Sequence, residues 1–191
     1  MNDLLQPEPQ VCHTRRKLIK AIGGFSALST IPVTAQGKVH SVKDQALNLI
    51  NLHTGESIHS TFFSEGQFQR SSLKELDHLL RDHRNGQIHK MDTALLSLLG
   101  DLQLQFGAEK PIHVISAYRS PETNAMLSQK SSKVAKKSYH MRGMAIDIRI
   151  PGVELKDLHH AALKAKAGGV GLYTRSNFVH LDVGRVRRWG A

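Results

Sequence analysis

Two histidines and an aspartate stand at spacings that could build a metal site. His140 precedes Asp147 by seven residues, and Gly143 between them permits a sharp change of chain direction. His180 lies in a distal segment where apolar and polar residues alternate. Two imidazoles and one carboxylate form the ligand set of a catalytic zinc site, where bound zinc lowers the pKa of a water to about 7. On spacing alone, a solvated strand face with structural histidines is the alternative interpretation.

The two carboxylates near these histidines, Asp147 and Asp182, are expected to have different roles. Asp147 lies in a run, residues 143–150, whose opposite face is isoleucine, so it needs a partner: a buried, unpaired charge costs several kcal/mol. Asp182 follows His180 by two residues and shares its strand face, about 7 Å away by strand rise. Asp182 could act as a general base or orient His180 from behind, and the sequence leaves both roles open.

The elements that would position these residues predict an α+β domain with helices packed on a mostly antiparallel sheet. Strands are expected where apolar and polar residues alternate or β-branched residues gather, over 46–52, 56–63, 112–115, 143–150, 170–173 and 178–183. Helices are expected from a capping box begun by Ser72, from Asp92 to Gly107, from Ser120 with Pro121 in the first turn, and over 154–167 before Gly168 and Gly169.

The N-terminus, residues 1–35, has the pattern of an export signal. Arg15 and Arg16 precede a mildly apolar stretch that is too short for a membrane span, and a small-residue cleavage pattern ends at Ala35. The arginine pair resembles the twin-arginine signal, with an ordinary Sec signal or a basic amphipathic helix as alternatives. We therefore expect export by the twin-arginine machinery, cleavage near Ala35, a periplasmic location, no stable membrane insertion afterwards, and a single domain over residues 36–191.

Composition narrows the class of protein. The sole cysteine, Cys12, lies in the predicted signal, which excludes an internal disulfide framework and a multi-cysteine zinc site. Without residues 1–35 the chain keeps 22 cationic and 14 acidic side chains, a formal charge of +8, so an anionic partner is expected. Aromatic residues are only 5%, too few for the stacking platforms that bind single-stranded nucleic acid. Together with export, this argues against a nucleic-acid partner.

Three segments carry a resemblance to a known family: 116–124 with Arg119, Ser120, Pro121 and Asn124; 138–147 with Ser138, His140, Gly143, Ala145 and Asp147; and the strand with His180. They resemble the zinc D-Ala-D-Ala peptidase group, which shares its core with the hedgehog signalling domain. The predicted signal and the closing residues 178–189 are similar to the exported murein endopeptidases of the MepK type.

This resemblance implies a hedgehog-like peptidase fold, with His140, Asp147 and His180 as zinc ligands and Arg119 as the arginine that binds a substrate carbonyl or carboxylate. Many members place a catalytic base just before the last ligand, but here Asn177 and Phe178 occupy those positions. Asp182 is thus the candidate catalytic carboxylate, with the second role described above.

The predicted function is a periplasmic zinc endopeptidase that hydrolyses amide bonds in murein stem peptides or cross-links, with peptidoglycan as its partner. The resemblance implies cross-links between stems as the target, a link between two diaminopimelate residues being one candidate. The alternative is a non-catalytic, zinc-stabilised cell-wall-binding module, which the hedgehog likeness and the missing base both favour.

Overall fold

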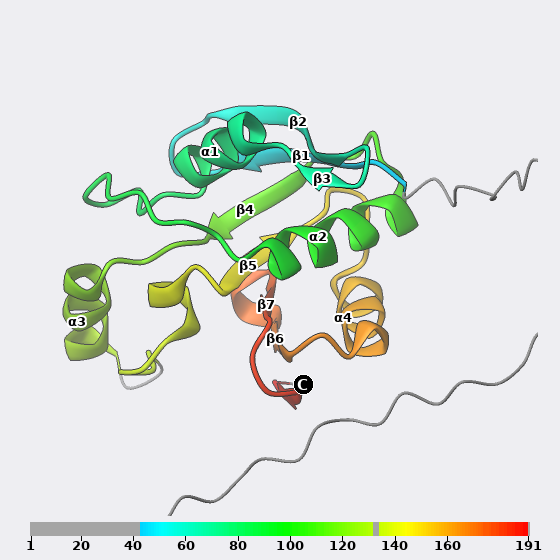
Figure 1. Cartoon of the computed structure of the whole chain (residues 1–191). Helices are drawn as coiled ribbons and strands as arrows, with labels where there is room; N and C mark the ends of the chain where they lie inside the picture. The colour runs from blue at the N-terminus through cyan, green and yellow to red at the C-terminus, as the bar shows by residue number, and fades with distance from the viewer. Residues whose placement is uncertain (1–42, 132–133, 191) are drawn as a thin grey trace, which may run out of the picture. The chain divides into compact units, whose positions relative to one another are not determined.

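Four α-helices and one eight-stranded sheet make up the part of the chain that the computed structural model describes, residues 43–131 and 134–190 (Figure 1). The strands lie in the order β3-β2-β1-β4-β5-β7-β6-β8, and all neighbours pair antiparallel except β1 with β4 and β6 with β8. The α+β class with a mostly antiparallel sheet is confirmed.

The strands are Gln45–Asn51 (β1), Ser57–Ser64 (β2), Gln67–Phe68 (β3), Ile112–Ser116 (β4), Ala145–Arg149 (β5), Gly169–Tyr173 (β6), Phe178–Asp182 (β7) and Arg187–Trp189 (β8). The helices are Arg70–Leu79 (α1), Thr93–Phe106 (α2), Pro121–Lys130 (α3) and Leu155–Ala165 (α4), with short 3₁₀ helices at Tyr139–Arg142 (η1) and Thr174–Ser176 (η2).

The hydrophobic core determines which sheet face is left for chemistry. Helix α1 packs on β2, α2 on β1, and α4 on β6 and β7, and Figure 1 shows α2 lying across the strands. Ile146 and Ile148 of β5 and Leu181 of β7 are fully buried in this core. Each such side chain contributes about 1.5–3 kcal/mol. Because successive strand residues point to opposite faces, Asp147 and His180 are directed away from the core.

Helix α1 begins earlier than the capping box predicts. Its N-cap residue is Gln69, so Ser72 lies inside the first turn, and no described side chain caps the helix. The chain enters the helix directly from β3, and the backbone N–H of Gln69 donates to the carbonyl of Phe62 at 2.9 Å. Strand pairing therefore fixes where the helix starts, and the prediction of a cap at Ser72 is wrong.

Two other predicted caps are confirmed. The Asp92 carboxylate accepts a hydrogen bond from the Ala94 N–H at 2.9 Å at the start of α2. The Ser120 hydroxyl accepts one from the Thr123 N–H at 3.1 Å at the start of α3, with Pro121 in the first turn. The second cap fixes the backbone directly after the arginine expected to bind substrate.

Helix α4 ends earlier than predicted, and the glycines after it have another use. It ends at Ala165, and Lys166 takes the left-handed conformation with φ +52°. A Cβ atom on Gly168 would collide with the backbone carbonyl of Asp182, and one on Gly169 would collide with the Asp182 carboxylate. These glycines permit close approach of the chain behind β7.

No helix within residues 43–131 and 134–190 is long and apolar enough to cross a membrane. The predicted signal, residues 1–35, and its cleavage site near Ala35 lie outside the described residues.

Candidate metal centre

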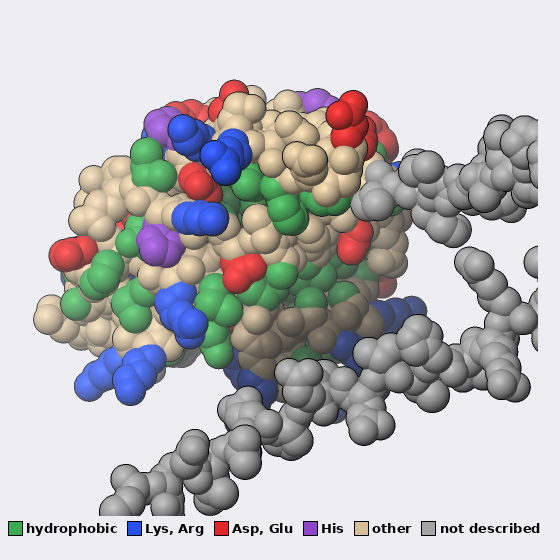
Figure 2. All heavy atoms as spheres, viewed as in Figure 1, with side chains coloured by type: hydrophobic (Ala, Val, Ile, Leu, Met, Phe, Trp, Pro, Cys, Tyr) green, Lys and Arg blue, Asp and Glu red, His purple; other side chains and the backbone are tan. Residues whose placement is uncertain are grey.

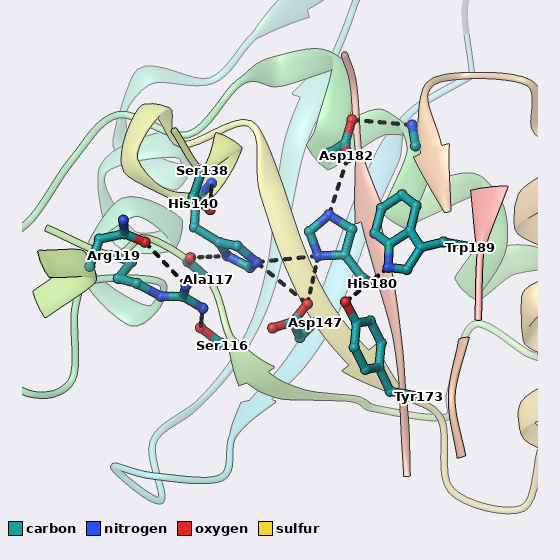
Figure 3. Close-up of polar contacts among 12 residues, drawn as sticks. Ser116, Ala117, Arg119, Ser138, His140, Asp147, Tyr173, His180, Asp182 and Trp189 are labelled. Atoms are coloured by element: carbon teal, nitrogen blue, oxygen red, sulfur yellow. Dashed lines mark hydrogen bonds and ion pairs between the residues drawn. The ribbon is translucent and has the colours of Figure 1, made fainter. Parts of the chain in front are cut away.

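Three residues predicted as zinc ligands meet on the sheet face that points away from the core. His140 belongs to η1, while Asp147 and His180 are the middle residues of β5 and β7. These strands pair antiparallel with Asp147 directly opposite His180. One ligand atom from each of the three residues lies within 4.8 Å of the others, and Figure 3 shows the side chains converging.

The spacing of the three atoms suits a tetrahedral ion. His140 Nε2 lies 3.3 Å from His180 Nδ1 and 3.4 Å from Asp147 Oδ1. The His180 Nδ1 to Asp147 Oδ1 distance is 2.8 Å. Zinc bonds of about 2.0–2.1 Å in tetrahedral geometry place ligand atoms about 3.3 Å apart. The two distances from His140 Nε2 match one face of a zinc tetrahedron. The third, between His180 Nδ1 and Asp147 Oδ1, would have to lengthen from 2.8 Å to about 3.3 Å.

The outer ring nitrogens fix the tautomers of both histidines. His140 Nδ1 lies 2.7 Å from the Ala117 carbonyl oxygen, and His180 Nε2 lies 3.1 Å from Asp182 Oδ2. Both oxygens accept hydrogen bonds, so the outer nitrogens carry hydrogen and, in neutral rings, the inner nitrogens carry lone pairs. Two inner lone pairs then face the Asp147 carboxylate, an arrangement that a proton or a cation must stabilise. The donor set therefore fits zinc.

Electrostatics keep the inner carboxylate ionised. Burial alone would raise the pKa of Asp147, but the neighbouring His140 and His180 outweigh it and hold that pKa well below its usual range. Burial alone would lower the pKa of His180, whereas hydrogen bonds to Asp147 and Asp182 raise it above its ordinary value. Metal ligation needs an ionised carboxylate and neutral imidazoles, so zinc binding must displace the proton that the raised pKa of His180 favours.

The local sequence holds His140 in place through backbone contacts. The Ser138 hydroxyl accepts from the His140 N–H at 3.3 Å, which caps η1. Gly143 ends η1 in the left-handed conformation, φ +65°, and a Cβ there would collide with the Lys90 carbonyl. The His140 carbonyl also accepts from the Arg119 N–H at 3.2 Å. Ring and backbone are thus both tied to the segment after β4.

Asp182 lies on the side of His180 away from the other two residues, and its side chain is 0% exposed. It accepts from the backbone N–H groups of Gly169 (3.1 Å) and Gly184 (2.9 Å) and from two Arg187 nitrogens (2.9 and 2.7 Å). Burial alone would raise the pKa of Asp182, but hydrogen bonds from His180, Arg187 and the two backbone groups lower it far below its usual range. These contacts suit a carboxylate that orients a ring.

Arg119 points its guanidinium into the cavity beside the three residues (Figure 3). Its contacts to Asn124 and Ser116 are long, 3.4 and 3.5 Å, and its buried Nε has no partner among the described residues. Burial lowers the pKa of Arg119, while the nearby charge of Asp147 raises it. A half-buried cation with unused donors is suited to binding a carbonyl or carboxylate.

The cavity has a volume of about 950 Å³ and a basic lining. Besides Arg119, its walls include Lys137, Arg175, Arg185 and Arg187. Asp147 is the only carboxylate among the described residues that line it. Such a cavity attracts anionic groups.

The positions just before His180 carry no proton acceptor into this cavity. Phe178 stacks on Tyr173 with ring centroids 4.5 Å apart, and Asn177 forms an exposed turn with φ +52°. Among the described lining residues, every carboxylate or imidazole belongs to the three-residue cluster.

Sequence reasoning missed several contributors to the centre. The Ala117 carbonyl contacts His140 across 23 residues, and the Arg187 guanidinium contacts Asp182, which lies five residues earlier; neither role was expected from the sequence. Trp189 lies beside His180, with ring centroids 5.1 Å apart, and donates from Nε1 to the Tyr173 hydroxyl at 2.8 Å. The only available signal was alternation in the closing strand, which puts Arg187 and Trp189 on one side.

Comparisons with known proteins place the chain in a family. Residues 39–189 match the peptidase family described as peptidoglycan L,D-endopeptidase MepK. Peptidoglycan L,D-endopeptidase MepK of Escherichia coli K12 is 44% identical over 176 residues, covering 92% of this chain and 96% of the relative. A probable peptidoglycan L,D-endopeptidase MepK of Haemophilus influenzae is 40% identical over 180 residues, covering 94% and 97%. No solved structure gives a significant match. The resemblance drawn from the sequence is confirmed, and the chain belongs to the peptidoglycan L,D-endopeptidase MepK family.

Proposed function

We propose that this protein is a zinc-dependent peptidoglycan endopeptidase that hydrolyses amide bonds in murein stem peptides or their cross-links. The observation that carries the proposal is the convergence of three lone-pair donors, from His140, Asp147 and His180, on the wall of a basic cavity. The names of the relatives, peptidoglycan L,D-endopeptidases, support this substrate and favour an amide between an L- and a D-configured centre.

His140, Asp147 and His180 would hold the ion through Nε2, Oδ1 and Nδ1. When bound, zinc lowers the pKa of a coordinated water to about 7 and polarises a carbonyl. Ala117 and Asp182 keep the two rings in the tautomers that leave these nitrogens free.

Arg119 would bind the carbonyl oxygen of the scissile amide or a neighbouring carboxylate and stabilise negative charge there. Its unused Nε and weakly engaged terminal nitrogens support that role. Stem peptides carry several carboxylates, and Lys137, Arg175 and Arg185 on the cavity wall have no carboxylate partner among the described residues.

For Asp182 we favour orientation of His180 over the role of general base. Its carboxylate is sealed from the cavity and already accepts from His180, Arg187 and two backbone N–H groups. A general base must lie within hydrogen-bond reach of the proton it takes, directly or through one water. Asp182 faces the outer nitrogen of His180 instead.

A non-catalytic, zinc-stabilised cell-wall-binding module is the second candidate. One observation favours it: the described residues lining the cavity offer no carboxylate or imidazole outside the ligand cluster to accept a proton. Both candidates require zinc and peptidoglycan, so only bond cleavage distinguishes them.

Digestion of purified, cross-linked muropeptides tests the proposal, with products identified by mass. The zinc-loaded protein should convert cross-linked dimers to monomers, adding one water for each bond cleaved. A chelator should stop the reaction and zinc should restore it. Binding to peptidoglycan without any release of fragments would support the binding module.

Two histidine variants provide the matched comparison in that assay. His180→Ala should lose zinc and cleavage together. His160→Ala changes an exposed histidine on α4 and should behave as the unaltered protein. Cleavage by His180→Ala at the normal rate would reject the proposed metal centre.

We also propose export to the periplasm by the twin-arginine route, with the signal cleaved near Ala35. Arg15 and Arg16 before a mildly apolar stretch support the route, and the peptidoglycan-directed names of the relatives support an extracytoplasmic site of action. Replacing Arg15 and Arg16 with lysines should leave uncleaved precursor in the cytoplasm. Normal periplasmic delivery of that variant would indicate the Sec route.

A further inference from the structure

We propose that Arg187 is a positioning residue for the metal centre: it holds the Asp182 carboxylate, which in turn holds the His180 ring with Nδ1 towards the cavity. This inference rests on the metal centre of the proposed function. Arg187 falls within the closing residues 178–189 noted for their resemblance, but the resemblance assigns it no role.

The contact between Arg187 and Asp182 has the geometry of a strong ion pair. Nη1 donates to Oδ1 at 2.9 Å and Nη2 donates to Oδ2 at 2.7 Å, a bidentate arrangement. The Asp182 side chain is 0% exposed and that of Arg187 is 32% exposed. Bidentate pairs fix orientation as well as distance, and this one is largely shielded from water.

The two Asp182 oxygens are held by different groups. Oδ1 accepts from the backbone N–H groups of Gly169 and Gly184 as well as from Arg187. Among the described residues, Oδ2 accepts only from Arg187 and from His180 Nε2, which is 3.1 Å away. Within the part of the chain that the structure describes, Arg187 is therefore the one group besides the imidazole that fixes the oxygen on which the orientation of His180 depends.

The sheet edge is shaped to bring Arg187 to this place. Strand β8 pairs in parallel with β6, with Gly169 beside Arg187 and Gly171 beside Trp189. A Cβ on Gly169 would collide with the Arg187 guanidinium, and a Cβ on Gly171 would collide with the Trp189 indole. The two glycines thus clear space for the two inward side chains of β8, whereas the intervening Arg188 is exposed.

Aromatic rings hold the guanidinium from its faces. Arg187 Cζ lies 5.3 Å from the Tyr139 ring centroid and 5.0 Å from that of Trp189. Trp189 itself lies beside His180 and is anchored to the Tyr173 hydroxyl. A guanidinium can donate in a plane while its faces contact rings, which a lysine ammonium cannot reproduce.

Zinc affinity of the purified protein, measured by competition with a chromophoric chelator, tests this role without relying on catalysis. Arg187→Gln should bind zinc about 10–100-fold more weakly, the usual cost of losing a group that orients a ligand. Arg188→Gln is the matched control: it removes the same charge from the same strand, but on the exposed side, and should bind zinc as the unaltered protein does.

A double-variant cycle separates positioning through Asp182 from a general weakening of the fold. If Arg187 acts through Asp182, then Asp182→Asn combined with Arg187→Gln should bind zinc no more weakly than the weaker single variant. Losses that multiply would overturn the proposal, as would wild-type zinc affinity in Arg187→Gln.

Arg187→Lys keeps the inference testable if Arg187→Gln does not fold, as judged by circular dichroism of the metal-free protein. Lysine preserves the charge but not the bidentate geometry, so it should bind zinc with an intermediate affinity. Wild-type affinity in this variant would also overturn the proposal. Absence of zinc binding by the unaltered protein would instead reject the metal centre itself, so the two failures are distinguishable.

Discussion

Two buried carboxylates, Asp82 and Asp147, have similar exposure, 1% and 7%, but very different surroundings. Asp82 accepts from the backbone N–H groups of Ser120 at 2.9 Å and Arg84 at 3.0 Å. Among the described residues, the polar partners of the Asp147 carboxylate are the imidazoles of His140 and His180. Burial alone therefore does not mark a functional acid. What distinguishes the two is whether the fold supplies permanent donors or leaves the charge to groups that can exchange a proton for a metal ion.

Asp82 and Asp147 also differ in what their charges do for the protein. Burial alone would raise the pKa of Asp82, but hydrogen bonds from Thr123, Ser120 and Arg84 lower it below its ordinary value. The carboxylate thus stays ionised while tying the loop after α1 to the start of α3.

Figure 2 shows one face of the molecule, on which cationic and acidic side chains are interspersed. Asp147, in contrast, lines the basic cavity.

The largest expected effect is loss of metal on changing Asp147. Asp147→Asn removes a direct ligand charge, so zinc affinity should fall by more than the 10–100-fold typical of an orienting partner. The metal-free variant should unfold within about 2–4 °C of the metal-free parent, because a change of about 1 kcal/mol moves Tm by that much in a domain of this size. Competition for zinc and thermal unfolding measure the two quantities. Unchanged zinc affinity in Asp147→Asn would contradict the claim that Asp147, unlike Asp82, is a metal ligand.

Asp82→Ala should do the opposite, lowering stability while leaving zinc affinity unchanged. Each buried N–H left without an acceptor costs about 1–3 kcal/mol, and two are at stake, those of Ser120 and Arg84. At about 2–4 °C for each kcal/mol, Tm should fall by roughly 4–24 °C. A variant of normal stability that binds zinc poorly would mean that Asp82, too, serves the metal centre.

The smallest effect concerns pH and the region around Asp82. Burial, then the charges of Arg84 and His53, lower the pKa of His83 from its ordinary 6.5 to about 4, against the opposing charge of Asp82. As pH falls, His83 is protonated in the unfolded chain before it is protonated in the folded chain. The free energy of unfolding therefore decreases as pH falls from about 6.5 towards 4. His83→Gln should remove about 1 kcal/mol of that dependence, after allowance for solvent screening at a half-buried site. Unfolding midpoints of both proteins at pH 7 and pH 5 provide the comparison, and equal slopes would contradict it.

Local sequence patterns predicted what depends on neighbouring residues. Strand alternation put Asp147 and His180 on the face opposite the isoleucine core, and the structure places them there. The cap at Asp92 depends on one side chain and the helix that follows, so it too was predictable. The prediction of a cap at Ser72 is wrong because a backbone hydrogen bond from Gln69 to Phe62 determines where the helix starts. Phe62 lies outside the capping-box residues, 72–75.

Long-range partners could not be predicted in the same way. The Ala117 carbonyl has no side-chain identity to read, although it fixes the tautomer of His140. Arg187 belongs to the closing residues 178–189 noted for their resemblance, but only the pairing of β8 with β6 shows that it lies beside Asp182. Gly168 looked like a helix terminator, whereas its lack of a side chain permits the approach to Asp182. The contacts of Arg187 and Gly168 depend on how β6 pairs with β7 and β8, which no pattern of neighbouring residues encodes.

Anomalous scattering at the zinc edge from crystals of the zinc-loaded protein tests the central claim most directly. A single strong peak should lie about 2.0–2.1 Å from His140 Nε2, His180 Nδ1 and Asp147 Oδ1. Asp182 should remain on the far side of His180, still bound to Arg187. A peak coordinated by Asp182, or one that lies away from His140 and Asp147, would contradict the account.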